Sequence, residues 1–398
     1  MERYVDFSKE INRWGMFSSK WSNSYARDAN NINPLVFTVA DMDYMTPQCV
    51  LDALKKPIEH GVLGYNDVDD SYIKSCVGWL KKRHNWLVDD KWILPCGSIK
   101  TAMLILAKEL TSPHEHSLYF TPSYSLFPKI IKACQLIEHK ISLTLMQECS
   151  IDLIEKEDEI HSFFLCNPHN PIGLLWREKE MQKIINVCVE RNALLFSDDI
   201  HSDLVIDSNA NYTPASLIDH RINDNVIYFM SPGKTFNISG LQTSYLIIPN
   251  DDIRIKATKA INLYGQGTPN TFGLHALEMA YNKCDSWLDE VISYLKANFF
   301  FLKKELLFCE PEIKVYPSEA TYFAWLDFTG FSSDNLALAN TLLKDYNIIL
   351  EDGINFGEDG VNFFRVNYAC PQSYIKVLIE ALVDMVDKKR KQNIMVVT

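Results

Sequence analysis

Short apolar runs alternate with amphipathic segments through the middle of the chain, and this alternation limits the folds open to it most strongly. Each run has four or five residues, most of them apolar, and a turn rich in polar residues, proline or glycine follows it, which is typical of a buried strand. Segments with apolar residues at helical spacing, such as 178–192, lie between the runs. This alternation predicts an α/β fold with a mainly parallel sheet and helices on both faces. The predicted strands are residues 116–120, 162–166, 193–197, 226–230 and 245–248.

The pattern changes near Asp285, where the regular alternation ends. The elements predicted beyond it are a long amphipathic helix (286–307), two strands (321–328 and 363–369) and a closing helix (375–391). They indicate a smaller α+β domain, and 398 residues are also too many for one small core. The expected division is an N-terminal segment that joins the small domain (1–48), a large domain (49–285) and a small C-terminal domain (286–398).

The composition argues against several classes of function. The formal net charge is −12, from 39 Lys and Arg against 51 Asp and Glu, which disfavours binding to nucleic acid. No run reaches the ~18 apolar residues that cross a bilayer, and residues 1–15 lack the apolar core of a signal peptide, so we expect no membrane association. The ten histidines show no zinc-like spacing, and we expect no metal site.

Ten cysteines are scattered along the chain from Cys49 to Cys370, and no two of them form a CxxC pair. Most lie within apolar stretches. We therefore expect buried, reduced thiols in a cytoplasmic protein rather than a framework of disulfides.

Lys234 lies in the stretch SPGKTF, directly after the predicted strand 226–230. A surface lysine in a loop is the simplest interpretation. However, the ligand crevices of open α/β sheets lie at the carboxyl ends of their strands. A lysine that is partly desolvated there can lose its proton near neutral pH and attack a carbonyl carbon. Lys234 is therefore a candidate catalytic residue.

Further polar side chains follow the other predicted strands, and parallel strands would bring them into one cleft. The set is Tyr124, Asn170, Asp198, His201, Ser231 and Lys234. Plain structural alternatives are a packed tyrosine, an Asn-Pro turn, a helix-capping or solvated aspartate and a hydrogen-bonded core histidine. From the residues alone, these alternatives stay open.

Two more features extend this set. Arg365 lies inside the apolar run FFRVNYA, where it needs a carboxylate partner, either a structural Asp or Glu or a substrate carboxylate. Ser98 precedes a predicted helix whose first turn offers free N–H groups to a phosphate, although Ser98 is also an ordinary N-cap residue. Pyridoxal phosphate (PLP) needs such a set: a lysine for a Schiff base, a carboxylate for the pyridine nitrogen, donors for the ring oxygen, an anion site and an arginine for the amino-acid carboxylate.

The chain resembles the fold-type I PLP enzymes, and among them the MalY/PatB-type cystathionine β-lyases, which are class I/II aminotransferase-like C–S lyases. The resemblance extends over nearly the whole length. The matching stretches are VADMDYMTP (39–47), HGVLGY (60–65), CNPHNPIG (166–173), SDDIHSDLV (197–205), SPGKTFNISGLQTSY (231–245), TYFAWLD (321–327) and FFRVNYACP (363–371). KTFN followed by GLQ, and DIHSD, are more specific to this subgroup than the other motifs. The resemblance implies a large domain with a mainly parallel mixed sheet flanked by helices, plus a smaller α+β domain.

The resemblance also implies roles around the cofactor ring. Lys234 would carry PLP as a Schiff base, and Asp198 would pair with the pyridinium nitrogen. Asn170 and His201 would hydrogen-bond the ring 3′-oxygen. The two ring faces would be covered by Tyr124, counted among the catalytic residues with Lys234 and Asp198, and by Ile200.

The phosphate and the substrate have their own implied contacts. Ser231 and the amides of Ser98 and Ile99 would hold the phosphate. Tyr65 would reach the phosphate of a neighbouring subunit, which implies a homodimer with shared active sites. The implied substrate-binding residues are Arg365 for the α-carboxylate, together with Asn170, Tyr65 and Ala40.

Several positions depart from the family pattern. They are Asp199 for Glu, Gly233 for a Ser that contacts the phosphate, Ile172 for the Thr of NPTG, Thr38 for Trp, and Ser98-Ile99 for Val-Val. We expect cofactor binding to survive these changes and substrate preference to be affected.

The expected activity is α,β-elimination from cystathionine or a related cysteine thioether, which gives a thiol, pyruvate and ammonia. A pocket near Tyr124 and Thr38 would suit the thioether. The alternatives are an aminotransferase that uses the same residues on an L-amino acid and, from another class, a catalytically silent regulatory homologue. The presence of Lys234, Asp198 and Arg365 argues against the silent homologue.

Overall fold

The computed structural model describes residues 5–21, 33–143, 154, 159–331 and 334–397. Within these residues, seven strands form one sheet in the order β2-β8-β7-β6-β5-β3-β4. Their bounds are β2 Ile93–Cys96, β3 His116–Thr121, β4 Ile137–Ser142, β5 Ser162–Cys166, β6 Leu194–Asp198, β7 Val226–Met230 and β8 Ser244–Ile247. The five predicted strands are confirmed to within about one residue at each end.

The sheet is mixed, with a parallel centre and an antiparallel edge. Strands β3 to β7 pair in parallel, whereas β8 runs antiparallel to both β7 and β2. The sequence analysis did not find β2 or β4. β2 contains Pro95, which weakens a strand signal, and β4 is an edge strand with mostly polar, exposed residues.

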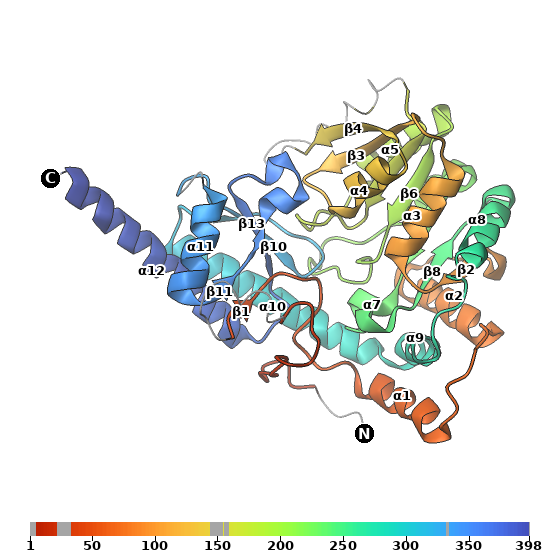
Figure 1. Cartoon of the computed structure of the whole chain (residues 1–398), viewed down its shortest axis with the longest axis horizontal. Coiled ribbons are helices and arrows are strands. Elements are labelled where there is room, and N and C mark those ends of the chain that lie inside the picture. Colours follow the sequence, from red (N-terminus) through yellow and green to blue (C-terminus); the bar gives the residue numbers. More distant parts are fainter. Residues whose placement is uncertain (1–4, 22–32, 144–153, 155–158, 332–333, 398) are drawn as a thin grey trace.

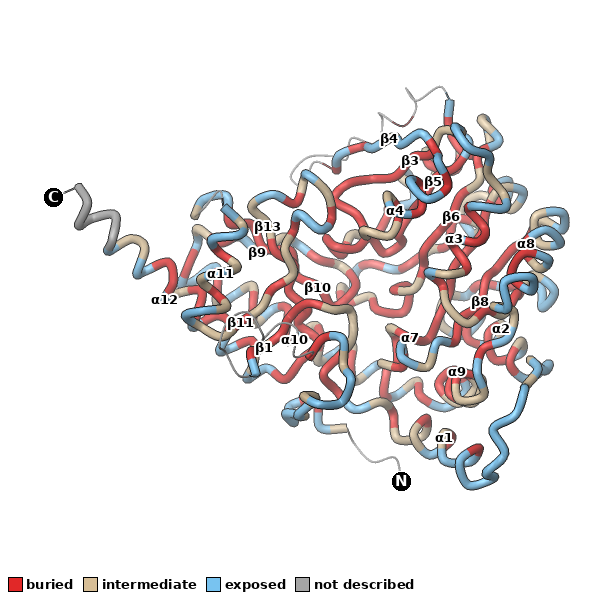
Figure 2. The backbone as a smooth tube through the Cα atoms, viewed as in Figure 1, coloured by how far each residue is buried: buried red, intermediate tan, exposed pale blue. Residues whose placement is uncertain are grey.

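Helices cover both faces of this sheet (Figure 1). Apolar residues of α3 (Ile99–Leu110), α4 (Leu126–Ala133) and α8 (Asp251–Leu263) pack on one face, and those of α2 (Asp70–His84), α5 (Glu178–Glu190) and α9 (Thr271–Lys283) on the other. Successive side chains of β5 point to opposite faces of the sheet. Phe164 therefore packs with α3, α4 and α8, whereas Phe163 and Leu165 pack on the face that α2, α5 and α9 cover. The buried backbone accordingly runs through the middle of the molecule (Figure 2).

A second, antiparallel sheet has the order β12-β13-β10-β9. Its strands are β9 Lys314–Val315, β10 Phe323–Asp327, β12 Glu351–Asp352 and β13 Phe363–Asn367, and the helices of this part are α10 Asp285–Cys309, α11 Asn335–Tyr346 and α12 Gln372–Val397. Two short strands, β1 (Leu35–Val36) and β11 (Ile348–Ile349), pair in parallel and attach the N-terminal segment to this part of the chain. The domain boundaries at residues 48 and 285 stay a prediction. The remaining helices are α1 Gln48–His60, α6 Ala215–Ile218 and α7 Pro232–Thr235.

No helix within the described part of the chain is both long and apolar enough to span a membrane.

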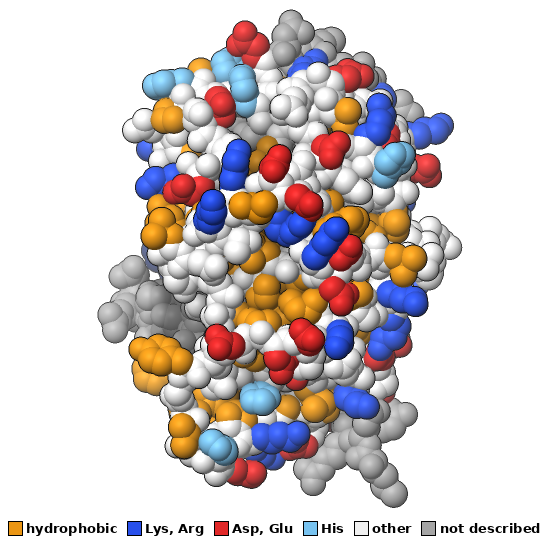
Figure 3. All heavy atoms as spheres, turned by 90° about the vertical axis from the view of Figure 1, so that its right-hand side faces the viewer, with side chains coloured by type: hydrophobic (Ala, Val, Ile, Leu, Met, Phe, Trp, Pro, Cys, Tyr) orange, Lys and Arg blue, Asp and Glu red, His pale blue; other side chains and the backbone are white. Residues whose placement is uncertain are grey.

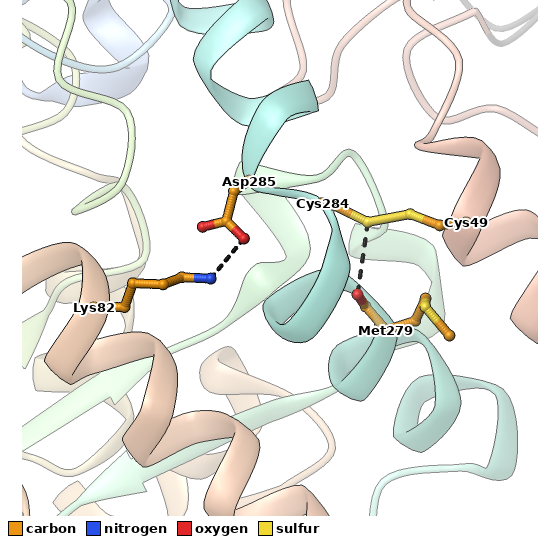
Figure 4. The surroundings of a disulfide bond; sticks show 5 residues. All are labelled: Cys49, Lys82, Met279, Cys284 and Asp285. Carbon is orange, nitrogen blue, oxygen red and sulfur yellow. Dashed lines mark hydrogen bonds and ion pairs between the residues drawn. A yellow bond between two sulfur atoms is a disulfide. The ribbon is translucent and has the colours of Figure 1, made fainter. Parts of the chain in front are cut away.

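Two cysteines depart from the expectation of reduced thiols. Cys49 in α1 and Cys284, between α9 and α10, form a disulfide across 235 positions of sequence (Figure 4). Tertiary packing brings these helices together, with α1 against α9, and no local spacing signals that contact. Among the described cysteines, the expectation of buried, free thiols is correct for Cys76, Cys96, Cys134, Cys166, Cys188 and Cys370, whereas Cys309 is free and exposed.

Gly173 closes the loop that follows β5 and has a positive φ of 70°. A Cβ atom there would lie 2.6 Å from the carbonyl oxygen of Ala320 and closer still to the Ser318 hydroxyl. We expect Gly173→Ala to destabilise the fold by at least about 2 kcal/mol, from backbone strain together with overpacking. The denaturation midpoint in urea measures this change.

Gly78 provides the matched control for that substitution. It lies inside α2, and a Cβ atom there would meet nothing within 4 Å. Because alanine is the better helix former, we expect Gly78→Ala to stabilise the fold slightly, by about 0.5–1 kcal/mol. Equal midpoints for the two variants would contradict the argument from Gly173.

Candidate active site

A cavity of about 180 Å³ lies where the carboxyl ends of β5, β6 and β7 meet the N-terminus of α3. Ten of the predicted site residues line it: Ala40, Ser98, Ile99, Tyr124, Asn170, Asp198, Ile200, His201, Ser231 and Lys234. The parallel strands therefore bring residues from six separate stretches of sequence to one place.

Lys234 lies in the short helix α7 just after β7, at the turn past the strand end that the sequence predicted. Ser231 caps this turn by accepting a hydrogen bond from the Gly233 N–H at 3.0 Å, and Pro232 occupies its first position. The Lys234 Nζ donates to the Ala40 carbonyl at 2.5 Å. Burial, with the positive charges of Arg365 and Lys100, lowers the pKa of Lys234 to about 8, although Asp41 and Asp198 oppose the change. Roughly a fifth of this amine is therefore neutral near physiological pH, whereas an ordinary lysine is almost fully protonated there.

Asp198 is the last residue of β6 and its carboxyl group is buried in the cavity wall. Burial raises its pKa to about 6, while the Ile200 N–H, at 3.4 Å, and the charge of Lys234 lower it. This carboxylate has few partners of its own and lies in a position to accept a cationic N–H donor. Its neighbour Asp199 points elsewhere, accepting hydrogen bonds from Ser197 at 2.6 Å and Tyr212 at 2.5 Å.

His201 presents a buried ring between aromatic side chains. Tyr322 and Phe323 contact it edge to face, with ring centroids 5.7 and 5.6 Å away. Burial lowers its pKa well below the ordinary value, with smaller effects from Lys234 and Arg365. Its Nδ1 is buried and has no hydrogen-bond partner among the described residues. Because His201 lines the cavity, this unpaired nitrogen is a candidate contact for a ligand.

Arg365 lies in β13 immediately behind Asn170. Its Nη1 donates to the Asn170 Oδ1 at 3.0 Å, and its Nη2 donates to the Thr38 carbonyl at 3.1 Å. The guanidinium stacks over Phe323 at 4.0 Å and lies 4.0 Å from the Glu351 carboxylate. Burial lowers the Arg365 pKa to about 10, and Glu351 partly offsets that change.

The Arg365 Nε has no hydrogen-bond partner among the described residues. Glu351 is too distant to be a close ion-pair partner at 4.0 Å. Arg365 therefore has one carboxylate neighbour, at 4.0 Å, and a buried Nε donor that no described residue uses.

The opposite end of the cavity is built from backbone and small polar groups. Ser98 is the N-cap of α3, as predicted, and its Oγ accepts from the Thr101 N–H at 3.5 Å. The N–H groups of Ile99 and Lys100 belong to the first helical turn, where the helix offers them no carbonyl partner. The Ser231 hydroxyl already donates to the Thr243 carbonyl at 2.7 Å. This end of the cavity has the character of an anion site.

The glycine at position 233 has a structural explanation. A Cβ atom there would lie 3.0 Å from the Ser231 Oγ and 3.3 Å from the Ser239 Oγ. Ser239, which also lines the cavity, places its hydroxyl beside the position that a serine at 233 would occupy.

Tyr124 and Ile200 lie in the cavity wall, both partly buried. Burial, together with the charge of Asp198, raises the pKa of Tyr124 above its ordinary value, so the phenol stays protonated at neutral pH.

Of the remaining residues singled out from the sequence, Arg365 lies behind Asn170 without lining the cavity, and Tyr65, Thr38 and Ile172 do not line it either. Tyr65 is fully exposed on the single chain. Thr38 is buried and reaches the site only through its carbonyl bond with Arg365. Ile172 lines a different cavity, beside Leu143 and Phe299. The expected thioether pocket at Thr38 is therefore not formed by its side chain.

Several cavity residues were not assigned a role from the sequence. They are Gly97, Lys100, Cys166, Ile238, Ser239, Gln242, Thr243 and Ser244. The sequence could have predicted Lys100 as a cavity residue, because it lies two residues after the predicted N-cap Ser98, in the first turn of the helix. Gly97 and Cys166 lie at the ends of β2 and β5, and the other five residues come from the segment 238–244 that follows α7 and leads into β8.

Comparison with known proteins identifies relatives along nearly the whole chain. Residues 32–382 match the family model for class I and II aminotransferases. The cystathionine beta-lyase PatB of Bacillus subtilis (strain 168) is 32% identical over 376 residues, which cover 92% of this chain and 96% of PatB. Protein MalY of Escherichia coli (strain K12) is 27% identical over 390 residues, which cover 96% of this chain and 98% of MalY.

A solved structure agrees with these relatives. The crystal structure of cystalysin from Treponema denticola, which contains a PLP cofactor, aligns with a TM-score of 0.90 and 31% identity, covering 96% of this chain and 100% of cystalysin.

The residues at the cavity fit PLP. A lysine amine of lowered pKa suits its aldehyde, the sparsely bonded Asp198 suits a protonated pyridine nitrogen, and the first turn of α3 suits a phosphate. The family match over residues 32–382 and the resemblance to PatB and cystalysin agree with this fit. The chain therefore belongs to the class I and II aminotransferase family of fold-type I PLP-dependent enzymes, in the branch that holds the PatB and MalY proteins.

Proposed function

We propose that this protein is a PLP-dependent C–S β-lyase that cleaves cystathionine or a related cysteine thioether. The products are a thiol, pyruvate and ammonia, with one water consumed. The observation that carries the proposal is a single cavity that holds a lysine amine of lowered pKa and a buried carboxylate, with an arginine directly behind its wall: Lys234, Asp198 and Arg365. The PatB relative, named as a cystathionine beta-lyase, supports elimination as the outcome.

The residue roles form part of this proposal. Lys234 would hold the cofactor covalently, and Asp198 would keep a proton on its pyridine nitrogen. Asn170 and His201 would donate to its ring oxygen, and the unpartnered His201 nitrogen supports that role. The ring faces would contact Tyr124 and Ile200.

The same proposal covers the phosphate and the substrate. The amides at Ser98 and Ile99, with Ser231, would bind the phosphate. Arg365 and Asn170 would bind the substrate α-carboxylate, and Ala40 would border the substrate. Because the Asn170 Oδ1 accepts from Arg365, its amide nitrogen is directed to other partners.

The chemistry divides between the cofactor and the chain. PLP, when bound, supplies an electron sink for the bond broken at the substrate Cα. Lys234, once its amine is released, would take the Cα proton as a general base, because a pKa of about 8 lies close to the operating pH. Arg365 fixes the carboxylate and thereby determines which Cα bond is aligned for cleavage. The thiolate then leaves from Cβ.

Product analysis tests the proposal. We would incubate the PLP-loaded protein with L-cystathionine and, separately, with S-methyl-cysteine, each with and without a keto acid. Pyruvate and a free thiol in the absence of keto acid would establish a C–S β-lyase. Amino transfer that depends on the keto acid, without any thiol, would refute it.

An aminotransferase is the second candidate, because the matching family model describes class I and II aminotransferases. The same lysine would then return the proton to the cofactor carbon instead of allowing the thiolate to leave. The keto-acid arm of the product analysis distinguishes the two activities.

Uptake of PLP by the cofactor-free protein is expected to depend on pH through Lys234. The amine attacks only when neutral, and burial lowers its pKa from 10.5 to about 8. The rate should therefore rise with pH, reach half its maximum near pH 8 and level off above it. Stopped-flow absorbance measures the rate, and a midpoint near that of a free lysine would contradict the buried environment of Lys234.

We also propose a homodimer with shared active sites, in which Tyr65 reaches the phosphate site of the partner. The support is the exposure of Tyr65 with its apolar neighbours Ile58, Val62 and Leu63, which are 60–69% exposed on the single chain. Figure 3 shows further hydrophobic side chains gathered among charged ones on the face at the right of Figure 1.

Mixed subunits test the role of Tyr65. If Tyr65 acts across the dimer, mixing Lys234→Ala with Tyr65→Ala subunits restores one intact site per mixed dimer. If Tyr65 acts within its own chain, both sites of the mixed dimer stay defective. A monomer in sedimentation analysis would refute the dimer itself.

A cytoplasmic location is the last part of the proposal. The six buried free thiols support a reducing compartment, with the Cys49–Cys284 disulfide as the contrary observation. Cell fractionation with an antibody against the protein tests it, and recovery from a secreted fraction would refute it.

A further inference from the structure

Asp203 is a buried carboxylate below the active site, and none of the roles proposed above uses it. It belongs to the DIHSD stretch, five residues after Asp198, and its side chain is only 5% exposed. It does not line the cavity. Burying a carboxylate costs free energy of desolvation unless its oxygens accept hydrogen bonds. The partners of Asp203 therefore indicate its role.

Donors from two other elements converge on this carboxylate. From α2, the His84 Nε2 lies 2.8 Å from Oδ1, and the Trp79 Nε1 lies 3.1 and 3.2 Å from the two oxygens. From α7, the Thr235 hydroxyl donates to Oδ2 at 2.8 Å. Burial would raise the pKa of Asp203, but His84, Thr235 and Trp79 together lower it below its ordinary value. Asp203 therefore stays ionised and binds α7 to α2.

The bond to Thr235 matters because Thr235 directly follows Lys234. The residue after it, Phe236, packs edge to face on Trp79 with ring centroids 5.5 Å apart. Trp79 itself stacks on Tyr281 of α9 at 4.8 Å. Both residues that follow the lysine are thus tied to the same buried cluster. Helix α7 has only four residues and cannot fix its own orientation by internal hydrogen bonds.

We propose that Asp203 is a positioning residue that orients Lys234 through its hydrogen bond with the Thr235 hydroxyl. The proposal rests on the assignment of Lys234 as the cofactor lysine. The Thr235–Asp203 bond fixes the rotation of α7 about its axis. That rotation directs the Lys234 amine toward the Ala40 carbonyl and into the cavity. Without the bond, α7 keeps its Ser231 cap and the Ser239 contact with Gly233 but loses its polar link to the buried cluster, and the amine samples orientations that do not reach the reacting atoms.

Thr235→Val provides the sharpest test, because it removes the hydroxyl and keeps the shape of the side chain. We expect kcat to fall about ten-fold, as for loss of one hydrogen bond to a charged group, with KM changed less than about two-fold. The bound cofactor reports the lysine orientation independently of turnover. Its absorbance, titrated with pH in the resting enzyme, should show a midpoint displaced by about 0.5–1 unit. Thr235→Ser, which restores the hydroxyl, should recover both values.

Two further variants complete the experiment. Thr258→Val is the matched control, since the Thr258 hydroxyl donates to the Arg254 carbonyl within α8, at 2.8 Å and away from the site, and it should leave kcat and the titration unchanged. Asp203→Asn should act in the same direction as Thr235→Val. Adding Thr235→Val to Asp203→Asn should cause little additional loss of kcat, because both substitutions act on the same hydrogen bond between Thr235 and Asp203. If Asp203→Asn fails to fold, the Thr235 series still decides the question.

A wild-type titration midpoint and kcat in Thr235→Val, even with a lowered melting temperature, would overturn the proposal and leave Asp203 a purely structural residue. This result would not affect the proposed lyase activity, which the product analysis of the unmodified protein tests separately. Conversely, an aminotransferase outcome in that analysis would leave the positioning role intact, because both activities need Lys234.

Discussion

Replacing Lys234 with alanine is expected to abolish the Schiff-base absorption of the bound cofactor and to lower kcat by at least about four orders of magnitude. The variant loses both the nucleophile that holds the cofactor and the base that removes the Cα proton, and general-base catalysis alone contributes about 10²–10⁴-fold. The amine is well placed for both tasks, because its pKa is lowered to about 8 and it points at the Ala40 carbonyl. Absorbance spectra and a pyruvate assay measure the two effects.

Lys256 supplies the control for this variant. It is an exposed lysine of α8 and does not line the cavity. Lys256→Ala should keep the spectrum and kcat of the unmodified protein. An unchanged cofactor spectrum in Lys234→Ala would refute the assignment of Lys234 as the residue that binds the cofactor covalently.

Replacing Arg365 with alanine is expected to raise KM for amino-acid substrates by about a hundred-fold, with a smaller change in kcat. A guanidinium that binds a buried carboxylate contributes strongly to substrate affinity, and truncation removes both its charge and its donors. In the structure it is held between Phe323, Asn170 and Thr38 and keeps an unpartnered Nε. Steady-state kinetics with cystathionine measures the change.

The control separates carboxylate binding from damage to the site. A cysteamine thioether has the amine and the sulfur but no carboxylate, so Arg365→Ala should affect it little. Arg221→Ala removes a half-exposed arginine paired with Asp219 on the surface and should alter neither constant. Equal losses for both substrates in Arg365→Ala would contradict the proposed role.

The sequence predicted the elements of the large sheet well, because each buried strand is a short apolar run with a turn behind it. The runs at 162–166 and 226–230 match β5 and β7 residue for residue. The edge strand β4 was missed, since its solvated residues carry no apolar run. The antiparallel direction of β8 could not be predicted from the sequence either, because the residue pattern of a buried strand does not depend on the direction of its neighbour.

The candidate site was predicted where residues follow a strand end or match a family motif. Asp198, Asn170, Ser231 and Lys234 belong to that group, and all four line the cavity. Thr38 and Ile172 were placed near the substrate by their positions in motifs, but their side chains face away from it. Alignment with a motif gives the position of a residue along the chain and not the direction of its side chain.

The sequence by itself determined the local elements, the α/β class and the residue types that PLP chemistry requires. Tertiary structure alone decided which of them meet. The Lys234 amine contacts a carbonyl 194 positions away, Asn170 meets Arg365 across 195 positions, and Asp203 joins Trp79 to Thr235 across 124 and 32 positions. The physical reason is that periodicity and turn residues encode contacts within a few positions, whereas these bonds arise only when the second sheet, the N-terminal segment and the helices pack against the large sheet.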